Sequence, residues 1–115
     1  MEEYNIHIPA VPEFERTVIG ALLNEPERLT EVAGFISPEC FNEPLNAEIY
    51  RIIVQMYDGN QKIDLYTVSQ RCMSLPELKE LKVAPYLVGC TQTVGSGAHI
   101  ASHAQIVKEA HVRRT

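Results

Sequence analysis

Two histidines near the C-terminus have the spacing that comes nearest to a metal site. His99 and His103 are four residues apart, so on a helix they share a face and could reach one metal ion. A metalloprotease helix carries glutamate directly after its first histidine, whereas this chain has Ile100 there. A third ligand would have to come from elsewhere, with Cys90 as a candidate. We therefore favour a structural or solvated role for both histidines and expect no bound metal.

Other groupings of reactive side chains lack the context of a catalytic site. The stretch at residues 95–97 has two glycines and no lysine, whereas a nucleotide-binding loop needs a lysine beside its glycines to hold phosphates. Paired carboxylates lie in a tail or in first helical turns, where we expect solvated, helix-supporting roles. These pairs are Glu2 and Glu3, Glu13 and Glu15, and Glu25 and Glu27. The sequence thus predicts no catalytic residues and no cofactor in this segment.

Composition sets the class of protein. The chain has 115 residues, which suits one domain. Its net charge is −5, so duplex DNA would repel the protein unless its lysine and arginine residues were concentrated on one face. The dense basic cluster of Lys108, Arg113 and Arg114 fits a helix C-terminus better than a nucleic-acid contact. The three cysteines are widely spaced, so we expect buried thiols rather than disulfides or zinc ligands. The acidic N-terminus and short apolar runs predict a cytoplasmic protein.

The apolar residues recur at three- and four-residue steps, which predicts an all-α fold, a compact orthogonal bundle of about six short helices. We expect residues 1–11 to be a flexible lead-in and residues 12–115 to form the domain. The expected helices run over about 12–25, 26–36, 44–57, 65–73, 83–93 and 98–115. Their inward stripes are Phe14, Val18, Ile19, Leu22 and Leu23; Leu29, Val32, Ala33 and Ile36; Leu45, Ile49, Ile52, Ile53 and Met56; Leu65, Val68 and Cys72; Tyr86, Leu87 and Cys90; and Ile100, Ala104 and Val107.

A few residues predict particular local structures. Gly20 lies inside the first helix, where a close helix crossing would explain it. Gly59 follows the third helix and is expected to end it in the left-handed conformation. Asp64 is expected to cap the fourth helix, with Ile63 and Val68 at staple spacing. Phe41 is expected to fill the core from a short turn.

Taken in order, several segments resemble the N-terminal domain of replicative DNA helicases of the DnaB type. Residues 12–23 are similar to the family's opening, where proline and glutamate precede a "V-L-G-x-L-L" helix, and residues 63–68 are close to its "I-D-x-x-T-L" helix start. The other matching segments are residues 41–50, 85–87, 98–100 and 104–109. Each motif is mainly a core stripe and a cap, so their order and spacing carry the resemblance, over about residues 10–115. The chain departs from the family at Asn46, His99 and His103, where histidine, asparagine and tyrosine are usual.

This resemblance implies a non-catalytic oligomerisation and primase-docking domain of a hexameric, ATP-dependent helicase that acts in DNA replication. It implies a separate motor domain using ATP and Mg²⁺ and making most DNA contacts, and a pairing hairpin, both expected to be absent from this segment. The isolated domain is therefore expected to be a monomer. Ile106 and Ala110 lie off the inward stripe of the last helix, and with Arg113 they are the candidate partner-binding residues.

One rival reading from another class is a helix-turn-helix DNA-binding domain made by the second and third helices. Short helices favour it, but the acidic balance and the lack of crowded arginine, asparagine or glutamine on one helix disfavour it. A small metal enzyme using His99 and His103 ranks below both.

Overall fold

The computed structural model describes residues 11–93 and 97–115. Within these residues the regular secondary structure consists of helices, with no strand, which confirms the all-α prediction. The α-helices are α1 (Val11–Asn24), α2 (Pro44–Asp58), α3 (Leu65–Met73), α4 (Val83–Gln92) and α5 (Ile100–Arg114). Three short 3₁₀-helices join them: η1 (Pro26–Glu31), η2 (Pro38–Cys40) and η3 (Gly97–His99). Of the lead-in expected at residues 1–11, residues 1–10 lie outside the described residues, and residue 11 is the first residue of α1. Residues 94–96 also lie outside the described residues.

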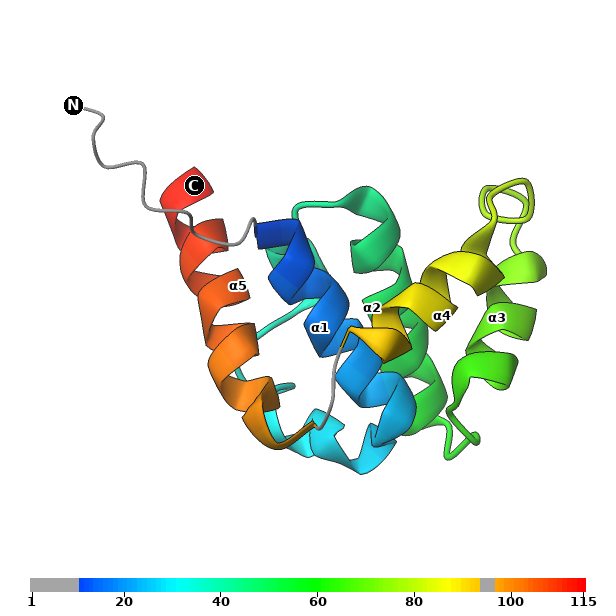
Figure 1. Ribbon diagram of the computed structural model, residues 1–115, viewed down its shortest axis with the longest axis horizontal. Coiled ribbons are helices and arrows are strands. Elements are labelled where there is room, and N and C mark those ends of the chain that lie inside the picture. The colour runs from blue at the N-terminus through cyan, green and yellow to red at the C-terminus, as the bar shows by residue number, and fades with distance from the viewer. Residues whose placement is uncertain (1–10, 94–96) are drawn as a thin grey trace.

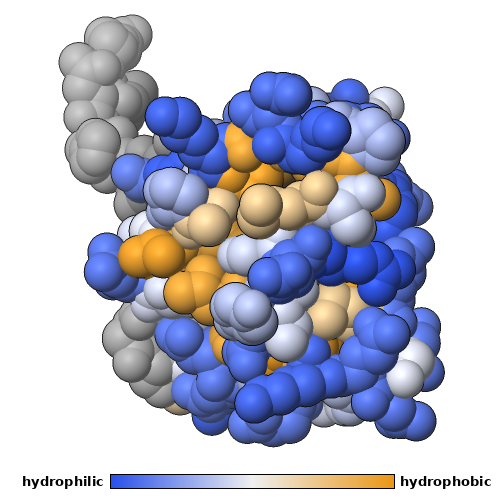
Figure 2. All heavy atoms as spheres, turned by 90° about the vertical axis from the view of Figure 1, so that its right-hand side faces the viewer, coloured by the Kyte–Doolittle hydropathy of each residue, from blue (hydrophilic) through white to orange (hydrophobic). Residues whose placement is uncertain are grey.

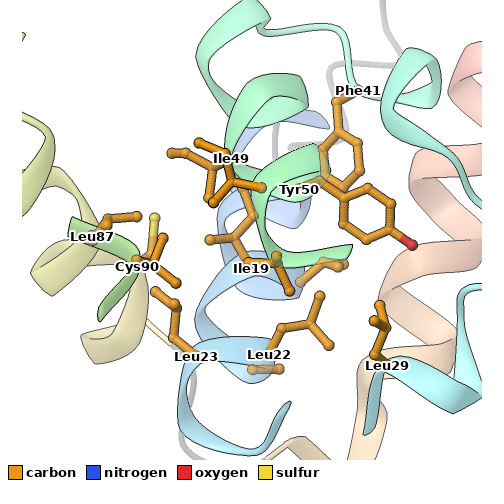
Figure 3. Packing of buried hydrophobic residues seen from close by; sticks show 14 of the residues in the cluster. Ile19, Leu22, Leu23, Leu29, Phe41, Ile49, Tyr50, Leu87 and Cys90 are labelled. Carbon is orange, nitrogen blue, oxygen red and sulfur yellow. The ribbon is translucent and has the colours of Figure 1, made fainter. Parts of the chain in front are cut away.

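Helix α1 lies at the centre of the bundle and contacts α5, α4 and α2 (Figure 1). Its buried stripe of Val18, Ile19 and Leu22 faces the stripes of the neighbouring helices (Figure 3). Almost every residue predicted to point inward is at least half-buried in the structure, and Phe41 does fill the core beside Tyr50, with ring centroids 4.9 Å apart. The helical periodicity of the sequence therefore predicted the core well.

Gly20 permits a close crossing of α1 and α4. A methyl group at its Cα would stand 2.0 Å from the carbonyl oxygen of Cys90 in α4, a distance that real atoms do not tolerate. The backbones of α1 and α4 can approach this closely only because the residue lacks a side chain. The predicted reason for this glycine is therefore confirmed.

The second expected helix is wrong in type. Residues 26–36 form the 3₁₀-helix η1 followed by turns, closed by hydrogen bonds such as Val32 N–H to the Leu29 carbonyl at 3.1 Å. η1 packs against α1, and tertiary packing of this kind can override a local preference for the α-helix. Leu29, Val32 and Ile36 are buried as predicted, but Ala33 is exposed.

The turn after α2 also differs from the prediction. Gly59 ends the helix with φ of −88°, and the left-handed residue is Asn60, with φ of 57°. Asparagine tolerates this region better than most residues because its short polar side chain can bond locally. The predicted cap of α3 is confirmed: the Asp64 carboxylate accepts a hydrogen bond from the Thr67 N–H at 2.8 Å, and Ile63 and Val68 are buried.

None of the described helices has the length and apolar character needed to cross a membrane. The last two predicted helices are present as α4 and α5. Helix α5 begins at Ile100, directly after η3, rather than at Ala98 as predicted.

Candidate docking surfaces

A fully buried carboxylate joins α1 to the start of α2. The Glu15 carboxylate accepts hydrogen bonds from the backbone N–H of Asn42 at 2.7 Å and of Glu43 at 3.2 Å. These amides stand at the N-terminus of α2, where backbone donors have no partner within the helix. The side chain of the N-cap residue Glu43 makes no capping hydrogen bond. Glu15 therefore caps α2 from another helix, and its charge faces the positive end of the helix dipole.

The same carboxylate continues into a chain of buried polar groups. Asn46 donates from its Nδ2 to Glu15 at 2.9 Å, and the Tyr86 hydroxyl donates to the Asn46 Oδ1. Glu15, Asn46 and Tyr86 thus connect α1, α2 and α4. Burial raises the pKa of Tyr86 to about 12, so the phenol remains a donor at neutral pH.

This arrangement corrects the sequence reading of Glu15 as a solvated residue. The signal was present, because Glu15 precedes Val18 and Leu22 at helical spacing and therefore lies on the inward face of α1. Asn46 likewise precedes Ile49 and Ile53 on the inward face of α2. Because both polar groups are satisfied by neighbouring helices, their role is to fix packing.

The thiols and imidazoles do not assemble a reactive centre. Burial raises the pKa of the Cys72 and Cys90 thiols to about 11 each, which keeps both protonated and weakly nucleophilic at neutral pH. The rings of His99 and His103 lie 6.4 Å apart, and His103 packs against Phe14 at 5.7 Å. Across residues 11–93 and 97–115, no three histidine, cysteine or acidic side chains gather where they could hold a metal ion.

The predicted partner-binding residues lie on α5, at one end of the molecule (Figure 1). Ile106 and Ala110 are half-buried, and Arg113 is exposed in the last turn. The structure also exposes Val112, with 56% of its surface accessible, which the sequence analysis did not single out. The basic residues His111, Arg113 and Arg114 fall in the last helical turn, where they complement the helix dipole.

A second surface lies between α3 and α4, at the opposite end from α5 (Figure 1). It is a hollow of about 520 Å³, which we call the α3–α4 groove. The groove is lined by Asp64, Leu65, Tyr66, Ser69, Gln70 and Met73 from α3 and its cap, and by Ala84 and Val88 from α4. Figure 2 looks onto this end of the molecule and shows apolar surface between hydrophilic side chains. Sequence reasoning missed this groove.

The structure does not support the alternative of a helix-turn-helix DNA-binding domain made by the second and third predicted helices. That unit needs two α-helices joined by a tight turn, whereas residues 26–36 form η1 and turns.

Comparison with known proteins gives one consistent family. The model of the DnaB-like helicase N-terminal domain matches residues 7–109. The replicative DNA helicase DnaB of Rhodothermus marinus is 34% identical over 106 residues, which are 92% of this chain and 11% of that protein. The DnaB of Geobacillus stearothermophilus is 27% identical over 92% of this chain and 23% of its own length. The chain therefore spans less than a quarter of these relatives.

Solved structures agree with the sequence comparison. The N-terminal domain of DnaB helicase from Mycobacterium tuberculosis superposes with a TM-score of 0.84 at 26% identity, over 90% of this chain and 75% of that one. A DnaB-like replicative helicase, described together with its interactions with primase, gives 0.76 at 26% identity, over 90% of this chain and 24% of that one. The chain belongs to the family of DnaB-like helicase N-terminal domains.

Proposed function

We propose that this chain is the collar and docking domain of a hexameric replicative DNA helicase, placing neighbouring subunits and primase. The match to the DnaB-like N-terminal domain over residues 7–109 carries the proposal. A solved relative is described with its interactions with primase, which supports the choice of partner. Catalysis, with ATP and Mg²⁺, and most contacts to DNA would belong to a separate motor domain, and the protein would act in the cytoplasm.

The chemistry of the domain fits a docking role. Its buried polar groups hold helices together, and accessible apolar side chains include Tyr66 and Met73 at the α3–α4 groove and Val112 on α5. We propose the α5 face of Ile106, Ala110 and Arg113 as one contact surface. Docking surfaces of this kind depend on a few buried apolar or arginine anchors more than on total area.

Titration calorimetry with purified primase from the same genome tests the proposal. We expect saturable binding in the micromolar range or tighter, about −8 kcal/mol or better. Lack of heat and of co-elution at concentrations about tenfold higher would contradict a primase-docking role. Tight, salt-dependent binding to duplex DNA would instead favour a DNA-binding domain.

The oligomeric state of the isolated domain is a separate expectation. Light scattering at micromolar concentration should give a monomer, and a stable hexamer of the domain alone would contradict this.

A further inference from the structure

We propose that the α3–α4 groove receives a short, apolar helical segment of primase, and this inference rests on the function proposed above. The groove walls are two helices whose lining residues recur at helical steps, Leu65, Ser69 and Met73 on α3 and Ala84 and Val88 on α4. From Leu65 to Met73 the wall is about 12 Å long, which is about two helical turns. An amphipathic helix laid into such a groove presents anchors at three- and four-residue steps.

The rim of the groove holds apolar side chains that have no packing role in the core. Tyr66 is 70% exposed, Met73 is 59% exposed and Val88 is 36% exposed. Tyrosine and methionine are favoured at the centres of protein interfaces, and methionine adapts to the shape of its partner. Three accessible apolar residues around one hollow are therefore suited to contact a ligand surface.

The size of this surface argues for a segment of a partner rather than for a stable pair of identical chains. Three partly exposed side chains offer a few hundred Å² at most, whereas a stable protein dimer buries about 800 Å² on each partner. A helix of two or three turns that inserts one or two large residues needs no more than the groove provides.

The chemistry of the lining defines the occupant. Of the described residues around the hollow, Asp64 alone is charged, and its carboxylate already caps α3 and lies 3.8 Å from the Lys62 ammonium. Ser69 lines the groove, is nine-tenths buried, and its hydroxyl has no hydrogen-bond partner. The occupant is therefore uncharged and apolar on its docking face.

Substitutions at the groove test this inference against a matched site on α2. Met73→Glu and Val88→Glu should each weaken primase binding at least about tenfold in calorimetry, because a charge would have to be buried against an apolar helix. Tyr66→Ala serves as a milder second variant. Tyr57→Glu introduces the same charge at a residue of α2 that is 36% exposed, as Val88 is, and that belongs to neither the groove nor the α5 face. It should leave the affinity within about twofold of the unsubstituted chain. Circular dichroism should show the same melting behaviour for all four variants.

The possible outcomes distinguish failure of the primase-docking function from failure of the groove assignment. If the unsubstituted chain fails to bind primase, the proposed function fails and this inference with it. If it binds but the groove variants bind equally well, or if Tyr57→Glu weakens binding as much, only the groove assignment is wrong. A dimer of the chain that Met73→Glu dissociates would also overturn it, in favour of a second copy as the occupant.

Discussion

A buried carboxylate destabilises a fold unless several donors satisfy it, and Glu15 meets that condition. Its two oxygens accept bonds from the Asn42 and Glu43 amides and from the Asn46 side chain, and Tyr86 completes the series. These buried polar side chains therefore hold α1, α2 and α4 in a fixed arrangement.

The substitution Glu15→Gln tests how much this cap contributes to the free energy of unfolding. The glutamine amide keeps the shape, but it loses the charge and turns a donor toward backbone donors. The free energy of unfolding should fall by about 1–3 kcal/mol, measured by urea denaturation. Glu13→Gln is the control, because Glu13 is exposed on the same helix, and it should change stability by less than about 0.5 kcal/mol. Equal effects of the two substitutions would contradict the assigned role of Glu15.

His103 makes stability depend on pH. Burial, and next the charge of His99, lower the pKa of His103, and its Nδ1 has no hydrogen-bond partner. The folded state therefore disfavours the protonated imidazole, so stability is steady above the ordinary histidine pKa of about 6.5 and falls as pH drops below it. Melting temperatures between about pH 7.5 and pH 5 should decline for the native chain and decline less for His103→Gln. The same decline in both proteins would contradict the role of His103.

At the scale of elements, the α-helices follow from sequence because their apolar stripes have the helical period over at least two turns. Residues 26–36 carry a similar pattern, but they form the 3₁₀-helix η1 and turns that pack against α1, so a local helical pattern does not by itself decide the type of helix. The α3–α4 groove could not be predicted, because it depends on how two helices are placed relative to each other. The Glu15 cap could have been found from its spacing to Val18.

The crossing of α1 and α4 can be tested with two glycines. Gly20→Ala would place a methyl group against the Cys90 carbonyl and should destabilise the fold by about 1–3 kcal/mol or more. Gly89→Ala lies in α4 where nothing stands within 4 Å of the added atom, and it should stabilise the fold by up to about 1 kcal/mol. Thermal or urea unfolding would measure both, and a stable Gly20→Ala variant would show that the helices are farther apart.

At the scale of the whole molecule, one hydrophobic core joins all five α-helices, with the α5 face at one end and the α3–α4 groove at the other (Figure 1). Among the described residues, α3 packs against α4 and α2, whereas α5 packs against α1. The two surfaces can therefore take different partners at once without competing for the same side chains. A body of this kind acts by holding surfaces in place, and binding should leave its core unchanged.

An amide-resolved NMR titration of the labelled chain with primase tests whether the domain binds primase at the α3–α4 groove as a preformed body. We expect chemical-shift changes at the amides of α3 and α4 around Tyr66, Met73 and Val88, and no change at the amides of Ile19 and Ile53. Shifts spread through the core, or no shifts at all at saturating primase, would contradict the view of this domain as a preformed docking body.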